Sequence, residues 1–149
     1  MLQNQIISVV GLGKMGLGIY NRLFDMGFNI HGYDINHDII KKNTQINILE
    51  IDKILELSDL VLFVVPSNDD IFKIVKKYTL KKNSTFLDLT TSMPNQTIKI
   101  KNFLNNKNIK YFDAAMSGGA NGAIAGTLTL MIGAKESQLS KYKSVLNSV

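Results

Sequence analysis

Three glycines near the start of the chain have the spacing of a phosphate-binding turn. Residues 11–16 read Gly-Leu-Gly-Lys-Met-Gly, between an apolar run and a segment with helical spacing of its apolar residues. A diphosphate can approach a main chain closely only where side chains are absent, and the free N–H groups at a helix start stabilise its charge. The pattern therefore predicts that a dinucleotide binds here. The residues expected to contact it are Gly11, Leu12, Gly13, Lys14, Met15 and Gly16.

An acid follows the next apolar run at the distance expected for ribose recognition. Asp34 lies about 20 residues beyond the glycines, where a carboxylate can accept hydrogen bonds from the adenosine ribose. It would also repel a 2′-phosphate, and no arginine is near it in the sequence. These features predict NAD as the coenzyme in preference to NADP. Alternatively, Asp34 could cap a helix that starts near Asn36, and Lys41 and Lys42 could weaken the discrimination.

Val65 and Pro66 end a further apolar run and are expected beside the cofactor. Their position fits this role because ligands of open α/β sheets bind at the carboxyl ends of the strands. Ser67 or Asn68, directly after them, could instead cap the next helix. Capping and a cofactor contact explain this segment equally well.

Hydroxyl side chains follow another apolar run at Thr90, Thr91 and Ser92. They could cap a helix that begins at Pro94, since proline is common at the first helical position. They could also direct a hydroxyl toward a nicotinamide ribose or ring. Taken alone, the segment favours capping.

A second Gly-rich stretch covers residues 113–128, and four of its glycines fall within nine residues. Ordering so many glycines costs conformational entropy, so a segment that simply connects two elements would be expected to contain fewer of them. Glycines beside Ser117 can bring N–H groups and a hydroxyl to a carboxylate. Ser117, Gly118 and Gly119 are therefore candidates for substrate binding, and the alternative is a long flexible loop.

Apolar runs alternate with segments of helical period along the whole chain. The expected strands are Ile6–Val10, Asn29–Tyr33, Leu60–Val65, Thr85–Leu89, Ile109–Phe112 and Leu128–Ile132, with a weaker one at Ile46–Ile48. The expected helical stripes are Met15, Ile19 and Leu23; Ile71, Ile74 and Val75; Ile98, Phe103 and Leu104; and Leu139, Tyr142 and Leu146, the last on a helix from about Glu136 to Asn147. This alternation predicts an α/β fold of Rossmann type, with a doubly wound, mostly parallel sheet and helices on both faces.

The composition fits one soluble domain of 149 residues, with 45% apolar and 19% charged residues. No apolar stretch approaches the roughly 20 residues of a membrane span, and the N-terminus lacks the features of a signal peptide. The expected location is cytoplasmic. The absence of cysteine excludes disulfides and thiol chemistry. His31 and His37 are interpreted as surface residues, so no metal site is expected.

The net charge of +5 comes from lysines spread along the chain, and Arg22 is the sole arginine. Specific recognition of nucleic acid relies on arginine and stacked aromatic residues, and neither is assembled here. A solvated, lysine-rich surface is the better interpretation, and neither a nucleic acid nor a membrane is expected as a partner. The charge can still attract anionic ligands.

Together these motifs resemble the β-hydroxyacid dehydrogenases, which include 3-hydroxyisobutyrate dehydrogenase and tartronate semialdehyde reductase and are related to the 6-phosphogluconate dehydrogenases. Residues 11–16 resemble the opening turn of that family, and residues 88–94, Asp-Leu-Thr-Thr-Ser-Met-Pro, resemble its D-x-S/T-T-x-x-P element. Residues 113–119, Asp-Ala-Ala-Met-Ser-Gly-Gly, are similar to its substrate signature D-A-P-V-S-G-G. The resemblance implies that Thr91 lies near the nicotinamide and that Ser117, Gly118 and Gly119 hold a substrate carboxylate.

Two differences from the family pattern affect this interpretation. Ala115 stands where the family usually has proline, which should loosen the approach to Ser117. The family's catalytic lysine and a neighbouring asparagine belong to a third motif, which the resemblance places beyond Val149 in a C-terminal helical domain. No catalytic residue is therefore expected within these 149 residues, and Lys14 is interpreted as directed to solvent or phosphate.

The resemblance implies an oxidoreductase that transfers hydride between NAD and a small β-hydroxyacid or its semialdehyde. Residues 1–149 are expected to form its NAD-binding domain, truncated before the last strand, which binds the cofactor without efficient catalysis. A homo-oligomer is expected only with the C-terminal helical domain, which is absent from this chain. One alternative is a stand-alone NAD-binding or regulatory module without enzymatic activity. Another is a basic protein whose nucleotide site serves nucleic acid.

Overall fold

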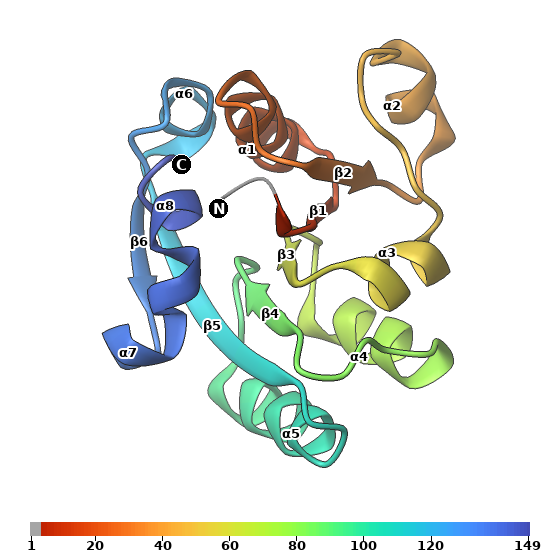
Figure 1. Ribbon diagram of the computed structural model, residues 1–149, viewed down its shortest axis with the longest axis vertical. Coiled ribbons are helices and arrows are strands. Elements are labelled where there is room, and N and C mark those ends of the chain that lie inside the picture. The colour runs from red at the N-terminus through yellow and green to blue at the C-terminus, as the bar shows by residue number, and fades with distance from the viewer. Residues whose placement is uncertain (1–3) are drawn as a thin grey trace.

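Six strands make up a single sheet in the computed structural model, which describes residues 4–149 (Figure 1). The strands are β1 (Ile7–Val10), β2 (Ile30–Tyr33), β3 (Leu60–Phe63), β4 (Thr85–Asp88), β5 (Lys110–Ser117) and β6 (Thr129–Ile132). Their order is β2-β1-β3-β4-β5-β6; the first five are parallel, and β6 runs antiparallel to β5. The order reverses between β1 and β3, which is where open α/β sheets bind ligands. The predicted doubly wound, mostly parallel sheet is confirmed.

Each of the six expected strands is present, and most are one or two residues shorter than expected. The weak strand expected at Ile46–Ile48 is only an isolated bridge between Ile48 and Gly32. In contrast, β5 continues past the expected end at Phe112 to Ser117 and enters the second Gly-rich stretch. Its antiparallel pairing with β6, which sets Ser117 opposite Thr129, accounts for this extension.

Helices cover both faces of the sheet. They are α1 (Lys14–Asp25), α2 (His37–Lys42), α3 (Ile51–Leu57), α4 (Asn68–Lys77), α5 (Pro94–Asn105), α6 (Gly119–Ala125), α7 (Glu136–Leu139), the 3₁₀ turn η2 (Ser140–Tyr142) and α8 (Lys143–Leu146). Figure 1 shows α1 and the α7–α8 segment on one side of the sheet, with α3, α4 and α5 on the other. None of the helices within residues 4–149 is long and apolar enough to cross a bilayer.

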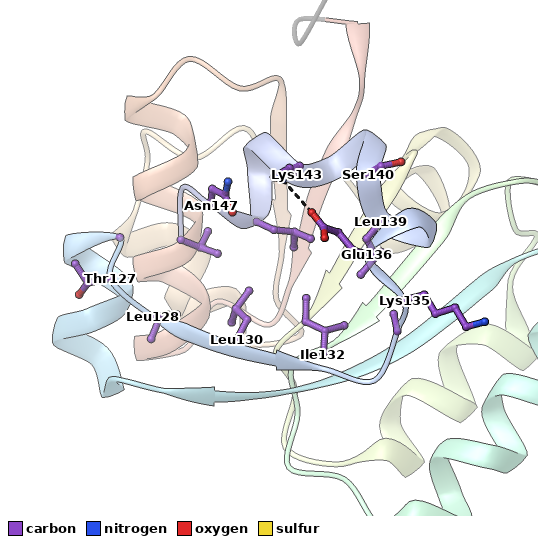
Figure 2. A pocket seen from close by; sticks show the side chains of 14 residues that line it. Thr127, Leu128, Leu130, Ile132, Lys135, Glu136, Leu139, Ser140, Lys143 and Asn147 are labelled. Atoms are coloured by element: carbon purple, nitrogen blue, oxygen red, sulfur yellow. Dashed lines mark hydrogen bonds and ion pairs between the residues drawn. The ribbon is translucent and has the colours of Figure 1, made fainter.

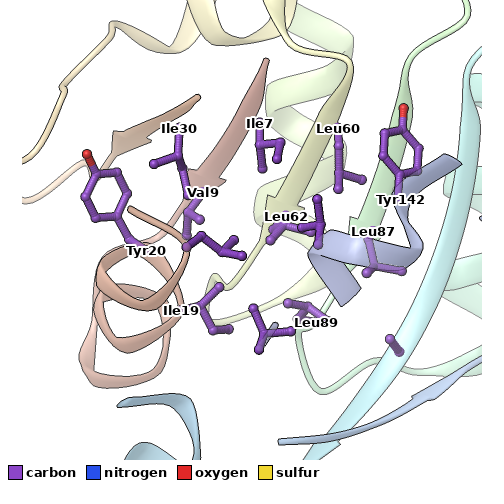
Figure 3. Close-up of a cluster of buried hydrophobic side chains, with 14 of the residues drawn as sticks. Ile7, Val9, Ile19, Tyr20, Ile30, Leu60, Leu62, Leu87, Leu89 and Tyr142 are labelled. Atoms are coloured by element: carbon purple, nitrogen blue, oxygen red, sulfur yellow. The ribbon is translucent and has the colours of Figure 1, made fainter. Parts of the chain in front are cut away.

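Successive strand residues alternate between two hydrophobic clusters. On β1, Ile7 and Val9 belong to the cluster that contains Ile19 of α1, as Figure 3 shows, whereas Val10 belongs to the cluster against α3, α4 and α5. Tyr142 also packs into the first cluster. Because both faces are covered, the central strands are buried throughout, which is why their sequences read as nearly continuous apolar runs.

Two helix predictions were wrong in detail. On α5 the buried stripe is Thr97, Ile100 and Leu104, and Ile98 is 59% exposed, because the face toward the sheet is offset by one residue. The single helix expected from about Glu136 to Asn147 is divided into α7, η2 and α8. The division between η2 and α8 directly follows Tyr142. The Tyr142 hydroxyl donates to the Asp59 carbonyl at 2.6 Å, so a tertiary contact fixes the path of the chain here.

The carboxylate of Asp59, just before β3, gives the fold a dependence on pH. It accepts hydrogen bonds from Lys81 Nζ at 2.7 Å and from the Ile6 N–H at 2.9 Å. Partial burial alone would raise the pKa of Asp59, but these donors outweigh it and hold the pKa below its ordinary value. Such a group stabilises the folded state above its unfolded pKa of about 3.9, and the contribution is lost as the pH falls through the folded pKa.

We therefore expect acidification below about pH 4 to destabilise the wild-type protein more than the Asp59→Asn variant, which has no carboxyl group to titrate at this position. Thermal unfolding of both proteins across a series of acidic buffers measures the difference. Identical slopes of melting temperature against pH would contradict this role of Asp59.

Candidate functional site

The Gly-rich turn between β1 and α1 requires glycine at two positions because a Cβ there would collide with the main chain. Gly11 has a φ of +97°, and a Cβ there would collide with the Val64 carbonyl oxygen. A Cβ on Gly16 would collide with the Gly11 carbonyl oxygen. Gly13 differs, because its backbone is extended and a Cβ would meet no protein atom within 4 Å. Internal packing thus does not require glycine at position 13, and the space beside it is open to a ligand.

The first turn of α1 presents free donors beside that space. The first bond of the helix runs from the Leu17 N–H to the Gly13 carbonyl at 2.8 Å. The N–H groups of Lys14, Met15 and Gly16 precede this bond and have no helical acceptor. No acidic side chain lies in the first turn, so these groups and the helix dipole favour an anion.

Asp34, at the end of β2, is hydrogen-bonded to the same turn. Its Oδ2 accepts from the Leu12 N–H at 2.6 Å and its Oδ1 from the Asn36 N–H at 2.7 Å. The helix-capping alternative for Asp34 is wrong, because Asn36 is the N-cap of α2 and accepts from the Asp38 N–H at 3.0 Å. Each carboxylate oxygen of Asp34 retains a lone pair that can accept from a ribose hydroxyl.

The turn, Asp34 and the loop after β3 share one pocket of about 880 Å³. The residues predicted to bind the cofactor that line it are Gly11, Gly13, Lys14, Met15, Gly16, Asp34, Val65 and Pro66. Leu12 does not line it, because its side chain is buried against Gly32, and only its N–H takes part through Asp34. The residues that sequence analysis expected at one site from three separate loops are thus brought together.

Sequence analysis missed the wall that α4 contributes to this pocket. Lys73, Ile74, Lys77 and Tyr78 line it with the spacing of one helical face. Ile74 had been assigned to the core stripe, and the i, i+4 pair of lysines was the signal that this face is not wholly buried. The side of the pocket near Tyr33 is mainly apolar, and burial raises the pKa of the Tyr33 phenol.

Thr91 lies in the turn between β4 and α5, outside the pocket lining, and is exposed. Its neighbour Thr90 is buried and accepts from the Val65 N–H at 3.3 Å, so the two loops are in contact. The expectation that the hydroxyl residues cap α5 is wrong: the N-cap is Met93, and the Ser92 hydroxyl donates to Asp88 Oδ2 at 2.9 Å instead. Of the two residues that could cap α4, Ser67 is the N-cap, and its side chain accepts from the Asp70 N–H.

Asp88 and Asn68 are buried polar residues beside these loops. Sequence analysis gave Asp88 no role of its own and considered Asn68 solely as a helix cap. The carboxylate of Asp88 is fully buried and accepts hydrogen bonds from four groups. The signal was an acid at the end of an otherwise apolar strand, since a buried charge requires several donors.

Ser117, Gly118 and Gly119 connect β5 to α6 and are exposed. Gly118 and Gly119 both have positive φ, +127° and +61°, which favours glycine at these positions. The long flexible loop that was the alternative is wrong, because most of the stretch belongs to β5 and α6. These three residues do not line the pocket beside Asp34.

A separate hollow of about 620 Å³ lies between β6 and the α7–α8 segment (Figure 2). Leu130, Ile132 and Leu139 give it an apolar floor, and Lys143 and Glu136 form an ion pair of 2.9 Å at its rim. It contains none of the residues that sequence analysis predicted to bind a cofactor or substrate.

The two histidines lie in different environments. His37 is exposed as expected, but His31 on β2 is half-buried, and burial lowers the pKa of its imidazole. Within residues 4–149, no three histidine, aspartate or glutamate side chains are grouped so that they could hold a metal ion.

Similar proteins include dehydrogenases that are about twice as long. The chain is 30% identical to the probable mitochondrial 3-hydroxyisobutyrate dehydrogenase of Arabidopsis thaliana, and the match covers 99% of this chain and 48% of that protein. The structure of Mycobacterium tuberculosis 3-hydroxyisobutyrate dehydrogenase with L-serine matches with a TM-score of 0.90 at 22% identity, over 97% of this chain and 51% of that one. A reductive aminase from Aspergillus terreus in complex with NADPH and ethyl levulinate matches with a TM-score of 0.82 at 15% identity, over 95% of this chain and 52% of that one.

A family model described as the NAD-binding domain of 6-phosphogluconate dehydrogenase matches residues 6–149. The matched range includes the Gly-rich turn, Asp34 and both later motifs. The chain spans about half the length of the 3-hydroxyisobutyrate dehydrogenase-like oxidoreductases that it matches. Together with the fold and the pocket, the family match shows that the chain belongs to the 6-phosphogluconate dehydrogenase NAD-binding family.

Proposed function

We propose that the chain binds NAD for an oxidoreductase that transfers hydride between the nicotinamide and a small β-hydroxyacid. The observation that carries the proposal is the open space beside Gly13, which the free N–H groups of Lys14 and Met15 border and Asp34 flanks. A diphosphate fits this arrangement because it needs both room and main-chain donors. Bound NAD supplies hydride transfer, and the protein supplies placement and charge.

The roles of the residues follow from their positions. Gly11, Gly13 and Gly16 would allow the diphosphate to approach the main chain, and Asp34 would accept from the adenosine ribose. Val65 and Pro66 would form the wall of the pocket on the nicotinamide side of the diphosphate, where the Val65 N–H donates to Thr90. The apolar residues near Tyr33 suit the adenine ring.

Two further assignments rest on the family resemblance. Thr91 would lie beside the nicotinamide, one residue beyond the Thr90 contact with the Val65 loop. Ser117, Gly118 and Gly119 would receive the carboxylate of the hydroxyacid at the end of β5.

We expect the 149 residues by themselves to bind the coenzyme without efficient oxidation of hydroxyacids. A general base needs hydrogen-bond reach to the substrate hydroxyl. The lysines that line the coenzyme pocket are Lys14, Lys73 and Lys77, and Ser117–Gly119 are not part of that lining. A lysine from outside this sequence would therefore take the proton, and a homo-oligomer would form through residues outside it as well. The expected location remains cytoplasmic.

Titration with NADH and NADPH tests the proposal. We expect NADH to bind at micromolar or weaker affinity and in preference to NADPH, because Asp34 would repel a 2′-phosphate. Arg22 does not line the pocket and donates instead to the Ser148 carbonyl at 3.1 Å. Lys73 and Lys77 do line it, so equal or tighter binding of NADPH would mean that these lysines override Asp34.

The Asp34→Ala variant should weaken NADH binding about tenfold or more, since hydrogen bonds to a charged group contribute about 1.5–3 kcal/mol. NADPH binding should change less, because the repulsion is removed together with the hydrogen bonds. The matched control is Asp38→Ala, which removes the same charge from an exposed position outside the pocket. Fluorescence titration measures all four affinities, and an unchanged ratio of NADH to NADPH affinity in Asp34→Ala would contradict the role of Asp34.

A further inference from the structure

A fully buried carboxylate lies behind the loops at the ends of β3 and β4. Asp88 Oδ2 accepts from the Tyr111 hydroxyl at 2.6 Å, from Asn68 Nδ2 at 2.6 Å and from Ser92 Oγ at 2.9 Å, while its Oδ1 accepts from the Thr90 N–H at 2.9 Å. Four donors on one carboxylate are more than a helix cap or a turn requires. They compensate the loss of hydration that a buried charge incurs.

Asn68 extends this network from β4 to the start of α4. Its Oδ1 accepts from the Met93 N–H at 3.2 Å, and its Nδ2 also donates to Ser92 Oγ at 2.8 Å. The third link is the hydrogen bond from the Val65 N–H to Thr90 Oγ1. The turn at residues 90–93 is thus fixed to the loop that contains Val65 and Pro66, and Thr91 lies in the middle of the fixed turn.

The one titratable donor of the network, the Tyr111 hydroxyl, keeps its proton at any ordinary pH. Burial raises the pKa of the Tyr111 phenol, and the neighbouring Asp88 carboxylate raises it further, so the phenol keeps its proton. Tyr111 comes from β5, whose pairing with β4 sets Tyr111 opposite Phe86. Strands β4 and β5, the loop after β3 and the start of α4 therefore contribute to the position of the turn.

The network does not extend to the other half of the pocket. Among residues 4–149, Asp34 accepts only from Leu12 and Asn36, and neither of these residues bonds to Asp88 or Asn68. The adenosine and diphosphate contacts are thus supported by β1, α1 and β2, whereas the Thr91 turn depends on Asp88.

We propose that Asp88, with Asn68, is a positioning residue for the nicotinamide half of the coenzyme. It acts by orienting Thr91 and the Val65–Pro66 segment and makes no contact with the coenzyme itself. The inference rests on the proposed NAD-binding function and extends it by separating the support of the nicotinamide half from the support of the adenosine half.

The test compares NADH with ADP-ribose, which has the adenosine and diphosphate but lacks the nicotinamide. In Asp88→Asn we expect NADH affinity to fall about tenfold, because buried donors lose their acceptor, while ADP-ribose affinity stays within about twofold. The fluorescence change of the nicotinamide on binding should also diminish. Calorimetry measures both affinities, and fluorescence reports on the nicotinamide environment.

Asn68→Ala provides the same test with the buried carboxylate retained on its three other donors. Its loss of NADH affinity should be about threefold to fivefold, again without loss of ADP-ribose affinity. The control for general destabilisation is Ile54→Ala, a fully buried residue of α3 that does not line the pocket, and it should leave both affinities unchanged.

An equal loss of NADH and ADP-ribose affinity in either network variant, or no loss of NADH affinity in both, would overturn this inference alone. If Asp88→Asn does not fold, the result for Asn68→Ala decides. A wild-type protein that binds neither ligand would overturn the proposed function, and the inference with it.

Discussion

Gly13→Val should weaken NADH binding at least about 100-fold, or about 2.7 kcal/mol, without lowering the melting temperature of the ligand-free protein. Gly13 has an extended backbone that any residue can adopt, and an added Cβ meets no protein atom within 4 Å. The valine side chain would instead occupy the space that we assign to the diphosphate. Calorimetric titration and a thermal melt of the same sample measure the two quantities.

Two further glycine variants make this result specific. Gly13→Ala adds a single carbon and should lose less affinity than Gly13→Val. Gly16→Ala should lower the melting temperature as well, because its Cβ would collide with the Gly11 carbonyl oxygen. Unchanged NADH affinity in Gly13→Val would refute the proposal that a diphosphate lies on this turn.

Tyr142→Ala should destabilise the protein by about 3–5 kcal/mol, as is typical when a large buried aromatic side chain is removed. Tyr142 is fully buried in the cluster that contains α1, and its hydroxyl donates to the Asp59 carbonyl at 2.6 Å. For a domain of this size the loss corresponds to a fall in melting temperature of roughly 6–20 °C. Urea denaturation measures the free energy of unfolding.

Tyr142→Phe separates the ring from the hydroxyl. It should cost about 1 kcal/mol, the usual net contribution of one hydrogen bond. NADH affinity should stay unchanged in both variants, since Tyr142 does not line the pocket. If Tyr142→Ala unfolded at the wild-type denaturant concentration, the α7–α8 segment would not stabilise the sheet in solution.

The sequence was sufficient to predict the sheet and the Gly-rich turn between β1 and α1 because local chemistry dictates both. Strands covered on both faces must be apolar along their whole length. At positions 11 and 16 a Cβ would collide with main-chain atoms, so glycine is required there. The position of Asp34 beside the turn was predictable for the same reason, since one helix and one strand set its distance from the glycines.

Other features could not be predicted because tertiary contacts determine them. The division of the C-terminal helix depends on the hydrogen bond between Tyr142 and Asp59, which are 83 residues apart in the chain. The antiparallel pairing of β5 and β6 converted an expected loop into regular structure. The Asp88 network joins residues from β4, β5 and α4, so no single stretch of sequence contains it.

The bond from the Leu12 amide to Asp34 has a practical consequence for protein engineering. The side chain that we propose to contact the ribose is also an acceptor for the main chain of the Gly-rich turn, so a designer could not change one without affecting the other. Replacement of Asp34 alone should make the affinities for the two coenzymes more equal and leave the Leu12 N–H without its acceptor. A successful switch would require a compensating acceptor for that amide in the same design round.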